Sequence, residues 1–210
     1  MNKILEIINK LLGLIKKFYK DNTEIIIPTV VMVSISVVVT LALSSTNMLT
    51  AGKIAQITKQ NTDKAMARVI EAEAFEELTA EVDGEEINYY KAINGEETAG
   101  YIFIVSAKGY GGDISVMTAI GEDLTVKAVE ILDAPDETPG LGQNITKEKF
   151  YTQYSGLKKD ITVVKNGADS ALNEINAVTG ATISSKAVTS AVNKSLETAA
   201  TIINLEGGNS

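Results

Sequence analysis

Thr179-Gly180-Ala181-Thr182 stands directly before a long amphipathic pattern near the end of the chain. Apolar residues recur there at helical spacing and predict a closing helix over residues 185–204, capped by Ser184 or Ser185. Free backbone N–H groups and the positive end of the helix dipole favour a phosphate at such a start. Gly180 and Ala181 leave the backbone unshielded, so a bulky group can approach it closely. Alone, the tetrapeptide also fits an ordinary Ser/Thr-rich turn.

Two glycine-rich loops precede this motif. Lys108-Gly109-Tyr110-Gly111-Gly112 lies between two predicted strands, and its glycines permit positive φ and close approach of a ligand. Glu137-Thr138-Pro139-Gly140-Leu141-Gly142 is a rigid loop that carries an apolar Leu between two glycines. Taken singly, each loop is better explained as a purely structural connection.

The strand signals are grouped in the middle of the chain. Four strands are expected in two hairpins: residues 87–93 with 101–106, and residues 113–120 with 125–132. The first hairpin is expected to have a loop lengthened by residues 96–100, and a short helical connection is expected near residues 150–154, before a strand at 161–164. Strands in the middle and helices at the ends predict an α+β domain with helices packed on an antiparallel sheet.

A membrane span is predicted near the N-terminus. Residues 25–43 contain no charged side chain, and nineteen helical residues cover about 28 Å, close to the hydrocarbon thickness of a bilayer. Pro28 is expected in the first turn, where its missing N–H matters least. A cleavable signal peptide is the alternative, but the apolar core is longer than usual for one. We therefore expect a retained anchor over residues 25–44.

The segments on either side of the span complete the predicted organisation. Residues 1–24 form an apolar face with lysines opposite, typical of an amphipathic helix lying on the cytoplasmic leaflet or on a partner protein. Residues 45–80 are predicted as a linking helix, residues 81–205 as the globular domain and residues 206–210 as a tail. The linking helix is expected to direct six apolar residues inward: Ile54, Ile57, Met66, Val69, Ile70 and Leu78.

Charge and composition exclude several functions. Residues 1–24 carry five lysines against three acidic residues, whereas the rest of the chain holds 14 basic and 24 acidic residues. The positive-inside rule then predicts a cytoplasmic N-terminus, a single pass through the plasma membrane and an extracytoplasmic domain. The acidic domain argues against a nucleic-acid partner. The chain has no Cys and no His, which excludes thiol nucleophiles, Fe–S clusters and histidine acid–base chemistry.

Three motifs in order, Gly109-Tyr110-Gly111-Gly112, the loop of residues 137–142 and Thr179-Gly180-Ala181-Thr182, resemble the FMN-binding domain family. One span followed by this domain in about 200 residues resembles the branch of that family formed by the G subunits of Rnf electron-transport complexes. The related C subunit of the sodium-pumping NADH:quinone reductase is usually longer.

This resemblance implies a cofactor and a set of residues that bind it. FMN would be joined through its phosphate, as a phosphoester, to Thr182 by a separate flavin transferase. Lys186, one turn into the helix, is a candidate to neutralise the phosphodiester. The other expected cofactor-binding residues come from the two motifs: Thr179, Gly180, Ala181, Thr138, Gly140, Leu141 and Gly142. No catalytic residue and no metal ligand are expected.

The resemblance also implies a role for the whole chain. It would be an electron-transfer subunit of a membrane-bound, ion-translocating ferredoxin:NAD⁺ oxidoreductase, docked on other membrane subunits and without turnover of its own. The alternatives are a stand-alone extracellular electron-transfer flavoprotein, the C subunit of a quinone reductase, or a non-redox anchored binding module. Two positions depart from the family pattern: Asn176 replaces an Asp that transferase recognition usually favours, and Pro135 replaces a His found in many relatives. The second departure implies that this His is dispensable for electron transfer.

Overall fold

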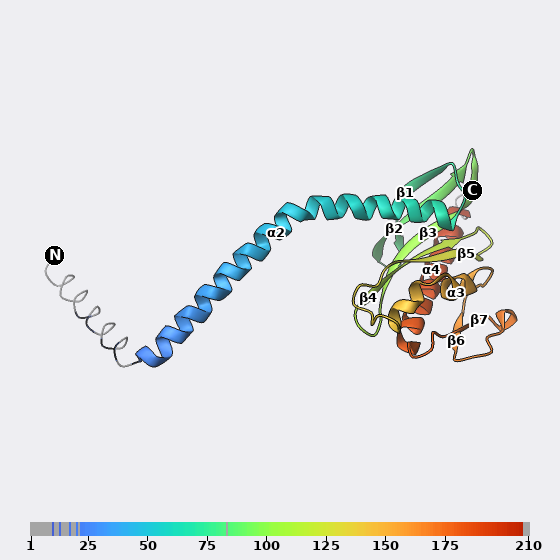
Figure 1. The fold of residues 1–210 in the computed structure, drawn as a ribbon. Coiled ribbons are helices and arrows are strands. Elements are labelled where there is room, and N and C mark those ends of the chain that lie inside the picture. The colour runs from blue at the N-terminus through green and yellow to red at the C-terminus, as the bar shows by residue number, and fades with distance from the viewer. Residues whose placement is uncertain are drawn as a thin grey trace. The chain divides into compact units, whose positions relative to one another are not determined.

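The computed structural model describes residues 10, 13, 17, 20, 22–82 and 84–207 (Figure 1). The chain divides into two compact units, Met1–Thr58 and Lys59–Ser210. The amphipathic helix predicted over residues 1–24 lies largely outside the described residues, as do the last three residues of the predicted tail.

Helix α2 (Thr23–Val69) provides the candidate membrane span. Among the described residues it is the one helix long and apolar enough to cross a membrane, with a mean hydropathy of 2.6 in its most apolar window. The apolar side chains of this stretch are exposed, including Ile54 and Ile57, which were expected to point inward. Pro28 lies inside the helix rather than in its first turn, because α2 already begins at Thr23.

The end of α2 corrects the predicted linking helix. The helix stops at Val69 rather than continuing to residue 80, and Ala74–Val82 forms strand β1. Strand β1 pairs antiparallel with β2 (Glu85–Asn94) along its whole length. The spacing of the apolar residues in this segment is compatible with a helix and with a strand. The long-range pairing with β2 decides in favour of the strand.

The second unit is built on a five-stranded antiparallel sheet in the order β1-β2-β3-β4-β5. The remaining strands are β3 (Glu97–Lys108), β4 (Asp113–Ile120) and β5 (Val126–Asp133). Asn94 pairs directly with Glu97, so the β2–β3 connection is a tight turn and not the lengthened loop that was expected. The register instead shifts beside Ala92, which places the extra residue in a β-bulge. The β4–β5 hairpin is confirmed.

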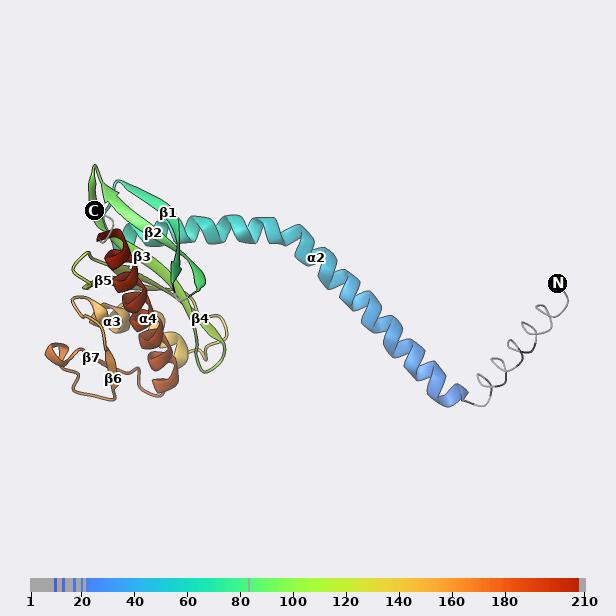
Figure 2. The same ribbon diagram turned by 180° about the vertical axis from the view of Figure 1, so that it is seen from behind.

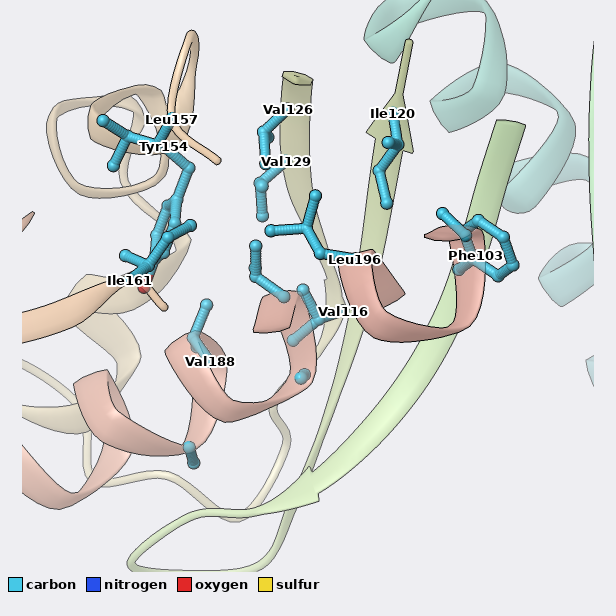
Figure 3. Packing of buried hydrophobic residues seen from close by; sticks show 14 of the residues in the cluster. Phe103, Val116, Ile120, Val126, Val129, Tyr154, Leu157, Ile161, Val188 and Leu196 are labelled. Atoms are coloured by element: carbon cyan, nitrogen blue, oxygen red, sulfur yellow. The ribbon is translucent and has the colours of Figure 1, made fainter. Parts of the chain in front are cut away.

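Two helices bury the two faces of the sheet. Helix α4 (Thr182–Gly207) packs on one face against β3 and β4, as the views in Figures 1 and 2 show. Figure 3 shows Val188 and Leu196 of α4 facing Val116 and Val129 of the sheet. The last turns of α2 cover the other face with Ala65, Met66 and Val69, which pack with Ile102, Met117 and Ala119. The central strands are therefore buried on both sides, which explains their continuous apolar runs.

Short elements connect β5 to α4. They are η1 (Gly142–Thr146), α3 (Glu148–Tyr151), η2 (Thr152–Tyr154), β6 (Thr162–Val164), η3 (Ser170–Leu172) and β7 (Glu174–Asn176). Strands β6 and β7 form a small parallel sheet, which the sequence did not reveal. Buried Tyr154 anchors this region because its hydroxyl lies 2.7 Å from that of Thr189 in α4. The predicted helical connection, the strand near residue 162 and the closing helix are all confirmed.

Candidate functional site

The three glycine-containing loops meet at one cavity of about 430 Å³. The first and last of them are more than 60 residues apart in sequence, and the fold brings all three together at the start of α4. The cavity is lined by Tyr110, Glu137, Thr138, Leu141, Gly142, Gly180, Ala181, Thr182, Ile183 and Ser184. Its size falls within the range of sites that hold cofactors and small ligands.

The middle loop enters the cavity through a tight turn at residues 138–141. The backbone N–H of Leu141 donates to the carbonyl of Thr138 over 3.1 Å, and Gly140 between them has φ +78°. A left-handed glycine after proline is the signature of a type II turn. The side-chain amide of Asn144 donates to the Gly140 carbonyl over 2.6 Å and fixes the turn from outside. Leu141 thereby remains half-exposed at the rim of the cavity.

A turn of the same kind leads into α4. The N–H of Ala181 donates to the carbonyl of Val178 over 2.9 Å, and Gly180 has φ +77°. The Ser185 hydroxyl accepts from the N–H of Val178 and donates to the carbonyl of Ala181, at 3.0 and 2.9 Å. A Cβ built on Gly180 would lie 3.0 Å from Leu141, so the two turns are in contact.

The start of α4 corrects the predicted cap. The helix begins at Thr182, so Ser184 and Ser185 lie in its first turn rather than before it. The helix starts early because the turn at Gly180 leads directly into the helical backbone. The hydroxyl group of Ser185 stabilises that turn through two hydrogen bonds. The first backbone N–H groups of a helix have no acceptor within it, and Thr182, Ile183 and Ser184 line the cavity. The expected helix start is thus present, three residues upstream of the predicted position.

The first loop lies against the middle loop so closely that only glycine fits. A Cβ on Gly111 would lie 1.9 Å from the backbone oxygen of Asp136, and one on Gly109 would lie 2.2 Å from Oε1 of Glu137. Neither glycine has a positive φ, so close approach and not backbone conformation requires them. The backbone N–H of Gly109 closes the loop by donating to the Gly112 carbonyl over 2.8 Å.

Glu137 joins the first two loops to the first turn of α4. Its side chain is 2% exposed. Oε1 accepts from the backbone N–H groups of Tyr110 (2.7 Å) and Gly111 (3.3 Å), while Oε2 accepts from the Ser184 hydroxyl (2.8 Å). A Cβ on Gly142 would lie 1.8 Å from Oε2, so the end of the middle loop also closes around this carboxyl group. Sequence reasoning missed Glu137 because a lone Glu in a Pro/Gly loop is typical of a solvated surface.

The structure places the predicted cofactor-binding residues in three locations. Six of them line the cavity together: Thr138, Leu141, Gly142, Gly180, Ala181 and Thr182. Gly140 shapes the turn without lining the cavity. Thr179 lines a neighbouring cavity of about 560 Å³, and exposed Lys186 lines a groove beside Asn193 and Lys194. Tyr110, Glu137, Ile183 and Ser184 are lining residues that were not predicted; the flanking glycines were the one sequence signal for Tyr110.

Asn176 is part of the support beneath the third motif. The backbone N–H of Asn176 donates to Oε1 of Gln153 (2.8 Å), and the Asn176 carbonyl accepts from Nε2 of Gln153 (3.2 Å). These two contacts fix the orientation of Gln153, with Oε1 directed toward residue 176. The side chain at position 176 must therefore offer a donor to Oε1, and Nδ2 of Asn176 donates to it over 3.3 Å. Oδ1 of Asn176 accepts from the N–H of Ala168 over 3.1 Å. An amide thus satisfies this position where a carboxylate would face Gln153 Oε1.

Comparison with known proteins agrees with this geometry. The FMN-binding domain model matches residues 109–197, which contain all three loops. The chain is 37% identical over 143 residues to the G subunit of the proton-translocating ferredoxin:NAD⁺ oxidoreductase complex of Clostridium ljungdahlii, covering 68% of this chain and 72% of that protein. It is 33% identical to the G subunit of the Na⁺-translocating complex of Acetobacterium woodii, covering 78% and 86%.

A solved structure supports the fold. The C subunit of the Na⁺-translocating NADH-quinone reductase of Parabacteroides distasonis superposes with a TM-score of 0.55 at 20% identity, covering 69% of this chain and 92% of that one. Three observations support the same family assignment: the α+β architecture, the ordered motifs and the sequence identity to these relatives. The chain belongs to the family of G subunits of ion-translocating oxidoreductase complexes and carries that family's FMN-binding domain.

Proposed function

We propose that this protein is a membrane-anchored electron-transfer subunit of an ion-translocating ferredoxin:NAD⁺ oxidoreductase complex, and that it carries FMN joined covalently to Thr182. One observation carries the proposal: Thr182 opens α4 at the cavity where the three loops converge. The G-subunit relatives are named as parts of such complexes, and the redox role is transferred from them.

The residues present fit FMN. The cavity combines half-exposed apolar side chains, Leu141 and Ile183, with the N–H groups of a helix start. Such a helix start accommodates a phosphate, and the apolar side chains suit the face of a flavin ring. Gly180 keeps the backbone open beside Thr182, whose hydroxyl would form the phosphoester with loss of water. Lys186 lies one turn further along α4 and is proposed to act on the phosphodiester through its charge alone.

The flavin would supply the electron chemistry, and the chain would supply position and electrostatics. A covalent bond also prevents loss of the cofactor into the extracytoplasmic space, because it replaces affinity with a permanently high effective concentration. The absence of Cys and His is harmless for such a carrier. We further propose that α2 anchors the protein in the plasma membrane, with the Lys-rich N-terminus in the cytoplasm and the FMN domain on the opposite side.

Replacing Thr182 tests the covalent site. Wild-type protein made together with a flavin transferase should show a mass gain of one FMN less water, and in-gel flavin fluorescence after denaturation, both mapping to the peptide that holds Thr182. Thr182→Ala should lose both signals. Thr201→Ala, which removes a threonine hydroxyl from an exposed position of the same helix, should retain them. Flavin retained covalently by Thr182→Ala would refute the site, and a colourless wild type would refute the redox role.

Co-purification separates the remaining alternatives. A component of a complex should be recovered from its native membrane with multi-span partners, whereas a stand-alone flavoprotein should be recovered alone. The G-subunit relatives favour the ferredoxin-linked complex over the quinone reductase. A non-redox binding module would carry no flavin in either preparation.

A further inference from the structure

Glu137 stands out among the buried polar groups of the described residues. Five of the seven buried polar or charged side chains lie in α4, and Glu137 is the one that carries an ionisable group. Its two oxygens receive three donors and face no acceptor among the contacts of the described residues, which is the pattern of an ionised carboxylate. No cation is paired with it there, because the salt bridge of the described residues joins Arg68 and Glu130.

The carboxyl group also determines the spacing of the loops. Positions 109 and 142 admit no Cβ, since one would collide with Oε1 and the other with Oε2. Tyr110 and Ser184, which donate to opposite oxygens, line the cavity from the first loop and from the first turn of α4. A residue that accepts from both holds the loop and the helix at a fixed separation, and its length and shape are therefore part of the site.

We infer that Glu137 is a positioning residue that clamps the first two loops and the start of α4 around the cofactor and places a fixed negative charge beside it, which opposes reduction of the flavin. The inference rests on the proposed function. Glu137 lines the same cavity as Thr182, away from the screening of bulk water. A buried charge acts on a neighbouring redox group far more strongly than an exposed one, and electrons added to the flavin are repelled by a carboxylate.

Two substitutions separate the charge from the clamp. Glu137→Gln keeps the shape and removes the charge: its amide oxygen accepts from Tyr110 and Gly111, and its amide nitrogen donates to a rotated Ser184 hydroxyl. Glu137→Asp keeps the charge, but its side chain is one methylene too short to reach both the first loop and Ser184. Asp136→Asn is the matched control, because this exposed carboxylate one residue away is screened by water and salt.

The measurements are covalent FMN incorporation, by intact mass, and the midpoint potential of the bound flavin, by spectroelectrochemical titration of the full chain in detergent. Glu137→Gln should incorporate FMN and raise the ratio of reduced to oxidised flavin at a fixed potential about tenfold, which is about 30 mV for a two-electron couple. Glu137→Asp should incorporate less FMN, and that flavin should titrate near the wild-type potential. Asp136→Asn should match the wild type in both measurements.

Several results would overturn the inference. Equal potentials in flavin-loaded Glu137→Gln and wild type would remove the electrostatic role and leave the proposed function intact, whereas an unloaded wild type would refute the proposed function itself. A folded Glu137→Gln protein without FMN would also contradict the inference, because the amide makes the same loop contacts. If neither Glu137 variant accumulates as folded protein, Ser184→Ala decides: it keeps the charge and removes one donor, and wild-type incorporation would overturn the clamp.

Discussion

The apolar stretch of α2 and the loop-built cavity satisfy their polar groups in opposite ways. In α2 the hydroxyl groups of the span bond locally, as when Thr29 donates to the carbonyl of Ile25 and Ser36 to that of Met32, each four residues back. In the cavity, Glu137 accepts from residues 26, 27 and 47 positions away in sequence. A helix in lipid must satisfy its polar groups internally, whereas a site made of loops needs partners from elsewhere in the fold.

The two regions are therefore sensitive to different kinds of mutation. The span depends on composition over about twenty residues, so it tolerates most single changes that keep it apolar. The shape of the cavity depends on close contacts between a few atoms around Glu137. One added methyl group can therefore displace several of the segments that line it. Charges in the span and added atoms in the cavity are therefore expected to have the largest effects.

Charging the centre of the span should have the largest effect of all. Replacing both Val33 and Val37 by Asp should raise the cost of insertion by about 6 kcal/mol, from about 3 kcal/mol for each charge at a helix centre. Most of the protein should then move from the washed membrane fraction to the soluble fraction. The matched Val33→Leu, Val37→Leu protein should remain in the membrane. Retention of the Asp variant would show that α2 is not the anchor.

A methyl group at Gly142 should disrupt the cavity. The added Cβ would lie 1.8 Å from Oε2 of Glu137 in a buried site. Overpacking of this kind should lower the free energy of unfolding by about 3 kcal/mol and reduce FMN incorporation. Tyrosine fluorescence during urea unfolding measures the first effect and intact mass the second.

Gly140→Ala is the control for that experiment. A Cβ on Gly140 meets nothing within 4 Å, so only its φ of +78° opposes the substitution. The expected cost is about 1 kcal/mol. Gly142 has no positive φ, so equal destabilisation by the two alanines would mean that Glu137 moves aside and that its contact does not require glycine at position 142.

Asn176→Asp tests the support beneath the third motif. The carboxylate would face Oε1 of Gln153 and lose the donor that Nδ2 now provides. We expect a loss of about 1 kcal/mol in the free energy of unfolding. Asn166→Asp, an exposed change on the same neighbouring cavity, should be nearly neutral. An Asn176→Asp protein as stable as the wild type would show that Gln153 reorients freely.

Thr118→Val should produce the smallest change, and in the opposite direction. Thr118 lies fully buried in β4, and its hydroxyl has no hydrogen-bond partner among the described residues. Replacing it with a methyl group of similar shape should stabilise the fold by up to about 1 kcal/mol, measured by urea unfolding. Thr189→Val, which removes a hydroxyl bonded to Tyr154 and to the Ser185 carbonyl, should instead be destabilising. Destabilisation by both would point to an unrecognised partner of Thr118.

Local sequence patterns were sufficient to predict several elements of this protein. Apolar composition predicted the candidate span, and periodicity predicted the β4–β5 hairpin and the helix that packs on the sheet. The glycines marked the second and third loops, because the left-handed turns at Gly140 and Gly180 require this residue. Each of these signals is local, because it follows from how neighbouring residues fit one backbone geometry.

Which groups from distant parts of the sequence come into contact depends on the assembled fold. The residues of strand β1 were predicted as helix because a short stretch of sequence does not show that they pair with β2. The early start of α4 depends on the hydrogen bond between the Ser185 hydroxyl and the preceding turn. The lysine expected near the phosphate, Lys186, lines a different groove. Glu137 is buried because the first loop and the start of α4 offer it donors while Gly109 and Gly142 lie close to its oxygens. A carboxylate alone prefers water, so its place in the core is a property of the assembled fold.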